Sequence, residues 1–116
     1  MKKIEPIPDY LQRLLSDKIN NPKFDQLIIN EYTQGQKIAP HIDHIKYFDD
    51  IIYCLSIGSD INIKFELNNI VKNLLIQDNS IYIMTKDSRY LWKHSLVNNT
   101  NKTRYSLTYR KVKENL

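Results

Sequence analysis

The sequence contains a single cysteine, Cys54, and only two glycines among its 116 residues. One cysteine excludes an internal disulfide, and the apolar segment IIYCLSIG around it predicts a buried strand with Cys54 in the core. No apolar run approaches the ~20 residues that span a bilayer, and the opening MKKIEPIPDY lacks the apolar stretch of a signal peptide. We therefore expect a soluble intracellular protein, cytoplasmic or nuclear, that is neither secreted nor bound to a membrane.

The remaining composition is that of an ordinary globular chain, with 41% hydrophobic and 26% charged residues. A length of 116 residues predicts a single compact domain, 1–116, with no room for a second folded unit. Lys and Arg outnumber Asp and Glu by 17 to 13, which gives a net charge of +4 and a pI near 9.1. This excess favours a polyanionic partner, although scattered lysines also form ordinary solvated surfaces.

Hydrophobic periodicity divides the chain into one helix followed by strands. Between Pro6 and Asn20 the apolar residues recur at helical spacing, which predicts an amphipathic helix. Short segments rich in Ile, Val, Tyr and Phe then alternate with polar turns and predict strands at 26–32, 38–43, 51–57, 61–66, 70–76, 80–85 and 104–112. Seven short strands favour a mainly β fold of the sandwich or jelly-roll type.

A metal site is predicted from the spacing of the histidines. His41 and Asp43 lie two residues apart in the strand 38–43, so their side chains should share one face, about 6.6 Å apart at the backbone. The pair suits the two-histidine, one-carboxylate triad of non-haem iron sites, although an isolated His-x-Asp also arises by chance. His94 is the only distant histidine that could complete it. His44 should point to the opposite face, and we exclude it.

The last predicted strand alternates polar with apolar residues, so one face should be polar while the other packs; the polar residues are Arg104, Ser106, Thr108 and Arg110. Facing water, these arginines would be ordinary solvated cations. Leaning inward, they could converge on a dicarboxylate, which arginine binds through paired hydrogen bonds. Asn30 and Tyr32 share a face of the strand 26–32 and offer an amide and a phenol, although Tyr32 also suits a plain strand aromatic.

These pieces follow one another in a fixed order: Asn30-x-Tyr32, His41-x-Asp43, Leu55-Ser56-Ile57-Gly58, the segment SRYLWKH ending at His94, and Arg104 to Arg110. The set covers about Ile7 to Val112 and resembles the AlkB-like Fe(II)- and 2-oxoglutarate-dependent dioxygenase family. The segments HIDH, LSIGS and SRYLWKH are most similar to the homologues that hydroxylate modified wobble uridines in tRNA.

The resemblance implies a double-stranded β-helix (jelly-roll) core behind one N-terminal amphipathic helix, with Fe(II) as cofactor and 2-oxoglutarate as cosubstrate. The catalytic iron ligands would be His41, Asp43 and His94. The distal carboxylate of 2-oxoglutarate would be bound by Arg104, Asn30, Tyr32 and Ser106. Arg110 would orient the metal-bound end of the cosubstrate.

Further residues are expected around the metal. The metal should lie inside the barrel among residues such as Tyr32, Leu55 and Trp92, which could equally be plain core. Arg89 is interpreted first as a surface arginine that pairs with a carboxylate, and second as a phosphate contact.

Two features depart from the family pattern. Ile45 stands at a position that is acidic in the bacterial DNA-repair enzymes. Only about 25 residues precede the first predicted core strand, where the family carries a lid that grips the nucleotide, so we expect either that most of this lid is absent or that the chain is a shortened version. The expected activity is oxidative demethylation or hydroxylation of a modified nucleobase in RNA or DNA by a monomer, with a protein partner as one replacement for the lid. The alternatives are a hydroxylase or demethylase of proteins or small molecules, and a non-catalytic nucleic-acid-binding or interaction module.

Overall fold

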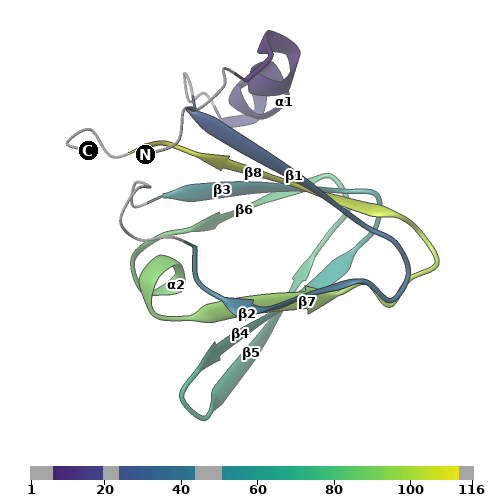
Figure 1. Cartoon of the computed structure of the whole chain (residues 1–116), viewed down its shortest axis with the longest axis vertical. Helices are drawn as coiled ribbons and strands as arrows, with labels where there is room; N and C mark the ends of the chain where they lie inside the picture. Colours follow the sequence, from purple (N-terminus) through teal and green to yellow (C-terminus); the bar gives the residue numbers. More distant parts are fainter. Residues whose placement is uncertain (1–6, 20–23, 44–50, 113–116) are drawn as a thin grey trace.

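The computed structural model describes residues 7–19, 24–43 and 51–112. Within these ranges the chain forms α1 (Asp9–Ile19), β1 (Gln26–Tyr32), β2 (Lys37–His41), β3 (Ile52–Ile57), β4 (Ile61–Leu67), β5 (Ile70–Ile76), β6 (Ser80–Met84), α2 (Lys86–Tyr90), β7 (Lys93–Val97) and β8 (Arg104–Arg110). The strands build two four-stranded sheets that face each other (Figure 1). We call the sheet of order β1-β8-β3-β6 the upper sheet and the sheet of order β2-β7-β4-β5 the lower sheet, as they lie in Figure 1.

The chain passes repeatedly from one sheet to the other, and all the strand pairs are antiparallel. This is a jelly roll, so the predicted fold class is confirmed. The seven predicted strands are all present. The sequence did not predict α2, which is too short to show a helical period, or β7, whose apolar residues Leu96 and Val97 are adjacent rather than alternating.

The N-terminal helix covers the outer face of the upper sheet (Figure 1). Leu11 and Leu15 lie four residues apart on one side of α1, and Leu15 is completely buried in a cluster with Leu107 and Tyr109 of β8. The Tyr109 hydroxyl donates a hydrogen bond to the Leu11 carbonyl at 2.8 Å, which ties the helix to the sheet. In the described part of the chain no helix is long and apolar enough to cross a membrane.

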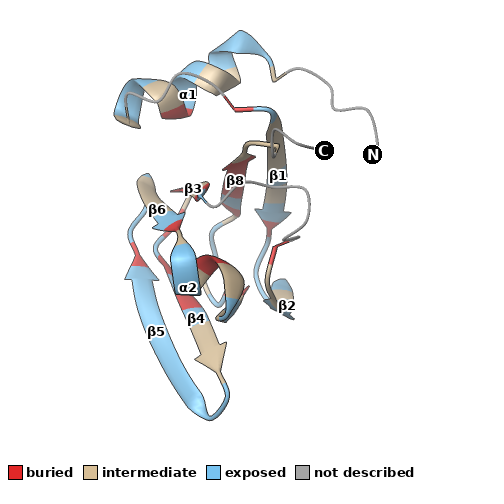
Figure 2. Ribbon diagram, turned by 90° about the vertical axis from the view of Figure 1, so that its left-hand side faces the viewer, coloured by how far each residue is buried: buried red, intermediate tan, exposed pale blue. Residues whose placement is uncertain are grey.

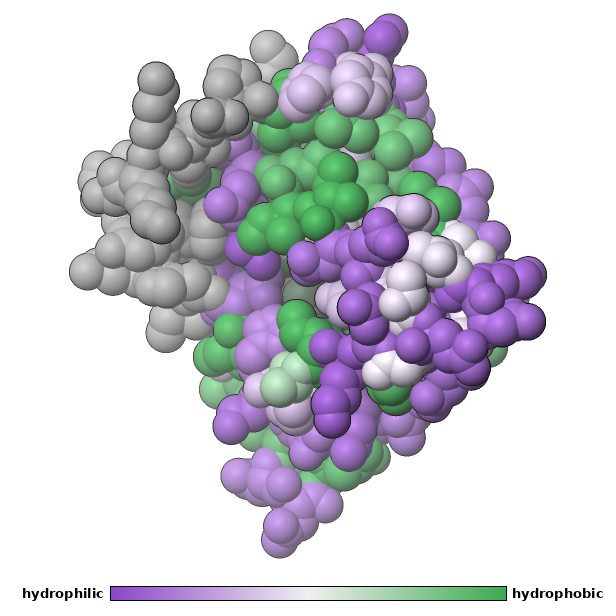
Figure 3. Space-filling model, turned by 45° about the vertical axis from the view of Figure 1, so that its right-hand side comes forward, coloured by the Kyte–Doolittle hydropathy of each residue, from purple (hydrophilic) through white to green (hydrophobic). Residues whose placement is uncertain are grey.

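The two faces of β8 differ as the alternation predicts. Leu107 and Tyr109 pack outward beneath α1, whereas Arg104, Ser106 and Thr108 point between the two sheets. Figure 3 shows hydrophobic side chains gathered in the upper part of this side of the molecule and mostly hydrophilic ones at the lower right. The polar face of β8 therefore lines the interior of the barrel rather than facing water.

Polar turns of suitable chemistry connect the strands. Asn68 and Asn79 adopt positive φ angles of 54° and 61°, a conformation that asparagine tolerates better than most residues. At Gly58, with φ 114°, a β-carbon would overlap the carbonyl oxygen of Thr103, so the turn after β3 packs directly against the start of β8. Glycine at this position thus helps to place Arg104.

The β4–β5 hairpin extends away from the body of the molecule (Figures 1 and 2). β5 is one of the two edge strands of the lower sheet, and six of its seven residues are exposed, as its pale blue colour in Figure 2 shows. Ile63 of β4, in contrast, packs in the core cluster of the lower sheet. The hairpin is thus anchored through β4 while β5 remains accessible.

Candidate active site

Two histidines meet across neighbouring strands of the lower sheet. His41 is the last residue of β2 and is paired directly with His94 of β7, and their ring centroids are 4.3 Å apart. The register between β2 and β7 is irregular between Ile38 and His41, around Pro40. Proline has no amide proton to give to a ladder and is tolerated on an edge strand such as β2. Beyond this irregular end of β2, Asp43 follows His41 by two residues.

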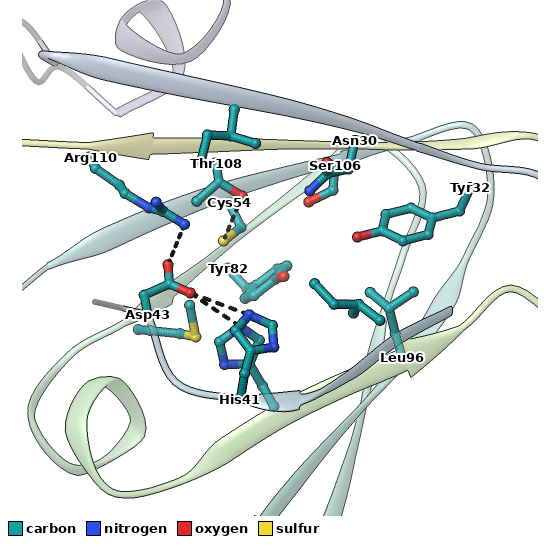
Figure 4. Close-up of a pocket in the computed structure, with 14 residues that line it drawn as sticks. Asn30, Tyr32, His41, Asp43, Cys54, Tyr82, Leu96, Ser106, Thr108 and Arg110 are labelled. Atoms are coloured by element: carbon teal, nitrogen blue, oxygen red, sulfur yellow. Dashed lines mark hydrogen bonds and ion pairs between the residues drawn. The ribbon is translucent and has the colours of Figure 1, made fainter. Parts of the chain in front are cut away.

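Asp43 lies beyond the end of β2 rather than within it, which corrects the predicted strand boundary, but its carboxylate still meets both histidines. Its Oδ1 lies 3.5 Å from His41 Nε2 and 3.7 Å from His94 Nε2. Its Oδ2 lies 2.8 Å from Arg110 Nη2 (Figure 4). One ligand atom from each of the three residues lies within 4.8 Å of the others, so together they could hold a metal ion.

The protonation states of the three side chains suit a metal site. Burial works to raise the pKa of Asp43, but the hydrogen bond from His41 and the charge of Arg110 outweigh it, and this pKa is lowered. Burial, with the adjacent His41, lowers the pKa of His94 to about 4. The hydrogen bond with Asp43 raises the pKa of His41. At neutral pH the site therefore holds an ionised carboxylate and a neutral His94, the forms that bind metals.

The tautomer of His41 is fixed by the backbone of its own strand. Its Nδ1 lies 2.8 Å from the carbonyl oxygen of Ala39, which can only accept a hydrogen bond. A His41 ring that binds a metal ion would therefore keep its proton on Nδ1 and offer the Nε2 lone pair to the ion. Such a second hydrogen bond is what orients a metal-binding imidazole.

A cavity of about 220 Å³ lies between the two sheets beside these residues (Figure 4). Seven of the eight predicted site residues line it: Asn30, Tyr32, His41, Asp43, His94, Ser106 and Arg110. The polar face predicted for the last strand also contributes Thr108. The sequence did not identify the further lining residues, which are Ile28, Ile38, Cys54, Tyr82, Met84 and Leu96. Figure 4 shows the Tyr32 hydroxyl pointing into the space, with Asp43 and Arg110 at the opposite end.

The eighth predicted residue, Arg104, lies next to Tyr32 and completely buried. Its Nε donates a hydrogen bond to Ser56 Oγ at 3.0 Å, and its guanidinium carbon lies 5.6 Å from the centroid of the Tyr32 ring. Among the residues that the structure describes, neither terminal nitrogen of Arg104 has a hydrogen-bond partner. An unsatisfied buried guanidinium is costly, so this end of the cavity is suited to an anion.

The neighbouring loop supports this anion-binding end. The completely buried Asn98 donates hydrogen bonds of 2.8 Å from its side-chain amide to the carbonyls of Tyr32 and Lys102. It thereby joins the end of β1 to the loop that leads into Arg104. Burial raises the pKa of the Tyr32 phenol although the charge of Arg104 works in the opposite direction, so this hydroxyl stays neutral and can donate a hydrogen bond.

Some expectations about the surroundings were wrong. Leu55 does not lie near the histidines; it packs on the outer face of the upper sheet with Leu15 and Leu107 beneath α1. The adjacent Cys54 points the other way and lines the cavity as well as being buried. His44, which the sequence excludes as a ligand, lies outside the described residues.

The geometry can be compared with known proteins. The family model of the 2OG-Fe(II) oxygenase superfamily matches residues 1–110. The chain belongs to this superfamily.

Curated relatives of the superfamily cover the chain to different extents. The uncharacterized protein L905 of Acanthamoeba polyphaga mimivirus is 37% identical over 91% of this chain and 59% of its own length. The tRNA (carboxymethyluridine(34)-5-O)-methyltransferase alkbh8 of Xenopus tropicalis is 42% identical over 62% of this chain and 12% of its own length. The alkylated DNA repair protein ALKBH8 homolog of Arabidopsis thaliana is 24% identical over 97% of this chain and 44% of its own length. The chain therefore spans only 12% to 59% of the length of these relatives.

Solved structures share the fold at lower identity. The structure of OsALKBH1 matches with a TM-score of 0.71 and 16% identity, covering 90% of this chain and 64% of that chain. A predicted oxalate decarboxylase from Thermotoga maritima matches with a TM-score of 0.55 and 17% identity, covering 84% and 74% of the two chains. Together with the sequence relatives, the match to OsALKBH1 confirms the prediction that this chain is AlkB-like.

The residues present fit the two groups that give the superfamily its name. Two imidazole nitrogens and one carboxylate are the donor set of a non-haem Fe(II) site with open positions. The unsatisfied nitrogens of Arg104 match the second carboxylate of 2-oxoglutarate, since arginine binds carboxylates through two parallel hydrogen bonds.

Sequence reasoning assigned Arg89 of this oxygenase to the surface, and the structure corrects that interpretation. Arg89 is 1% exposed, and its Nη1 donates a hydrogen bond to the main-chain carbonyl of Asp43 at 2.9 Å. The start of α2 places it there, because Ser88 Oγ accepts a hydrogen bond from the Thr85 amide and donates one to the Thr85 carbonyl. The Thr85 and Ser88 spacing is a helix-start signal that could have revealed α2.

Proposed function

We propose that this domain is an Fe(II)- and 2-oxoglutarate-dependent dioxygenase that hydroxylates or demethylates a modified nucleobase, with RNA as the favoured substrate. Its iron ligands are His41, Asp43 and His94, and its cosubstrate site extends from them to Arg104. Asn30, Tyr32, Ser106 and Arg110 line the space between.

One observation carries the proposal. The cavity between the sheets has a converging His-Asp-His set at one end, and beside Tyr32 at the other lies a buried arginine without partners for its terminal nitrogens among the described residues. A small dianion that bridges a metal ion and a guanidinium would satisfy both ends. 2-Oxoglutarate carries two carboxylates at the ends of a short chain and meets this requirement.

With Fe(II) and 2-oxoglutarate bound, such a site supplies the oxidation of a substrate C–H bond by molecular oxygen, with release of succinate and carbon dioxide. The protein residues bind, orient and enclose. Arg110 holds Asp43 Oδ2 and keeps this carboxylate turned toward the histidines. Ile38, Met84 and Leu96 give the cavity apolar walls that exclude water, which strengthens the polar contacts inside.

The nucleobase part of the proposal is supported by the relatives and by the charge. One relative is named for an alteration of a tRNA uridine and another for the repair of alkylated DNA. The net charge of +4 suits a polyanionic substrate. RNA is favoured because the segments HIDH, LSIGS and SRYLWKH resemble the wobble-uridine hydroxylases most closely.

The cofactor assignment is tested by adding Fe(II) and 2-oxoglutarate under anaerobic conditions and recording the weak visible absorption of the ternary complex. Admission of air should then release succinate. His41→Ala and Asp43→Ala should each abolish the absorption, and His44→Ala is the matched control that should retain it. Absence of the complex in the wild type would overturn the dioxygenase assignment. Equal loss in all three variants would show that the ligand assignment is wrong.

The substrate is tested separately. The protein is incubated with bulk tRNA and with methylated oligonucleotides, and the digested nucleosides are analysed by mass spectrometry. An oxidised or demethylated nucleoside that requires both Fe(II) and 2-oxoglutarate is expected. Unchanged nucleosides beside active succinate release would redirect the search to protein or small-molecule substrates.

A further inference from the structure

The row of residues that contains the two histidines continues outward across the lower sheet. His94 of β7 is paired with Phe65 of β4, and Phe65 is paired with Lys72 of β5. Directly paired residues of antiparallel strands point to the same face of a sheet. The ring centroids of Phe65 and His94 are 6.2 Å apart, which agrees with this register. Lys72 therefore lies on the same inner face as His94, two strands away.

Trp92 holds the Lys72 side chain at this face. The Lys72 ammonium lies 5.7 Å from the centroid of the Trp92 ring, within the range of a cation–π interaction. Trp92 precedes His94 by two residues and is half-buried, whereas Lys72 is exposed. In the described part of the chain Lys72 has no carboxylate partner. A cation positioned by Trp92 therefore lies on the face of the lower sheet that carries the candidate iron site, two strands from His94.

The strand around Lys72 is open to a ligand. On the same face of β5, the flanking Ile70 and Leu74 are 54% and 49% exposed. Neighbouring strands are about 4.8 Å apart, so the backbones of Lys72 and His94 are separated by roughly 10 Å. This separation is comparable with the reach of a nucleotide from its base to its phosphate. A cation flanked by an indole and apolar side chains is also what binds single-stranded nucleic acid, through phosphate contacts and base stacking.

We propose that Lys72 and Trp92 form a phosphate-binding subsite for single-stranded RNA at the rim of the active site, next to the nucleotide whose base enters it. This inference rests on the proposed function, because it names the part of an RNA substrate that the β4–β5 hairpin contacts. The phosphate accepts hydrogen bonds from the Lys72 ammonium. Trp92 orients that ammonium and offers its ring to a neighbouring base.

Lys37 provides a matched control on the opposite face. Like Lys72 it is exposed, lies on an edge strand of the lower sheet and forms no ion pair within the described residues. Its neighbour Ile38 packs inward in the core cluster, so Lys37 points outward, into a groove on the outer face. Lys72→Ala and Lys37→Ala change the net charge equally and remove an exposed side chain from the same sheet.

The experiment measures binding of a fluorescein-labelled anticodon stem-loop RNA carrying 5-carboxymethyluridine at the wobble position. Fluorescence anisotropy is recorded anaerobically with Fe(II) and 2-oxoglutarate present, over a range of salt concentrations. Lys72→Ala should raise the Kd severalfold and lower the slope of log Kd against log salt by about 0.7, the loss of one single-strand phosphate contact. Lys37→Ala should leave both close to the wild type, and Lys72→Arg should restore binding. Melting temperatures should stay unchanged, because both lysines are exposed.

The outcomes separate this inference from the proposed function. Equal weakening by Lys72→Ala and Lys37→Ala would show a general charge effect and overturn the subsite, as would failure of the wild-type protein to bind the RNA. A selective loss in Lys72→Ala, with no oxidation of any RNA nucleoside by the wild type, would support the subsite while overturning nucleobase oxidation. Trp92→Leu should reproduce part of the loss, because the ammonium is then no longer held in place.

Discussion

Arg89 reaches from α2 to the main-chain carbonyl of Asp43, a residue 46 positions earlier in the chain, with an Nη1···O distance of 2.9 Å. Asp43 follows the end of β2 and has no strand ladder of its own to hold it. The bond from Arg89 is therefore one of the few described contacts that fix the backbone of this ligand, while Arg110 fixes its carboxylate. Arg89 acts on the metal site through Asp43, so it is a positioning residue.

Replacement of Arg89 by methionine should weaken metal binding. The change leaves the Asp43 carbonyl without its donor, and loss of an outer partner of a metal ligand typically lowers metal affinity by about 10- to 100-fold. Titration with Co(II), followed by its visible absorption, measures this directly. Arg89→Lys should retain part of the affinity, because lysine can still donate one hydrogen bond. Arg13→Met, on the exposed face of α1, is the control that should bind Co(II) like the wild type. Wild-type affinity in Arg89→Met would refute the positioning role.

The sequence predicted the part of the site where polar and apolar residues alternate along a strand and the polar face turns to the interior of the barrel. In β8 the residues Arg104, Ser106 and Thr108 alternate with packing residues, so the pattern identified the polar wall. In β3 both faces are apolar, and periodicity could not tell that Cys54 faces the cavity while Leu55 faces α1. The role of Arg89 could not be predicted, because its hydrogen-bond partner is distant in the sequence and such a bond leaves no local sequence pattern.

Arg104→Met should selectively impair the binding of 2-oxoglutarate. Each charge-assisted hydrogen bond contributes about 1.5–3 kcal/mol, so loss of two such bonds, about 3–6 kcal/mol, should raise the Kd at least ~100-fold. Pyruvate is a 2-oxo acid without the distal carboxylate, and its weaker binding should not change. Anaerobic titration of the Fe(II)-loaded protein with both acids measures the two affinities. Lys102→Met removes an exposed cation two residues earlier and should have no effect. If pyruvate binding fell as much as that of 2-oxoglutarate, Arg104 would not contact the distal carboxylate.

The thiol of Cys54 should be inert in the native protein although it lines the cavity. Cys54 is 2% exposed, and burial raises the pKa of its thiol to about 11, so almost no thiolate forms at neutral pH. A disulfide reagent such as dithionitrobenzoate should therefore react slowly with the native chain and stoichiometrically after denaturation in urea. Rapid native labelling would mean that the upper sheet opens readily between β3 and β6. Bound metal and 2-oxoglutarate should slow labelling further, because they would occupy the cavity that Cys54 lines.

The hydrogen bond from Tyr109 to the Leu11 carbonyl should make the attachment of α1 dependent on pH. Tyr109→Phe removes the bond and should lower the free energy of unfolding by about 1 kcal/mol near neutral pH. Burial raises the pKa of Tyr109 from 10.0 to about 12. A raised folded-state pKa means that the neutral phenol contributes its full stabilisation below about pH 10, and that this contribution is lost as the pH rises toward 12.

Urea denaturation of the wild type and of Tyr109→Phe at several pH values gives the difference in their free energies of unfolding, in which the other titrating groups cancel. The gap between wild type and Tyr109→Phe should shrink with rising pH, and a constant gap would refute the assignment. Tyr105→Phe, on the same strand but with its side chain 39% exposed, should change stability little at any pH.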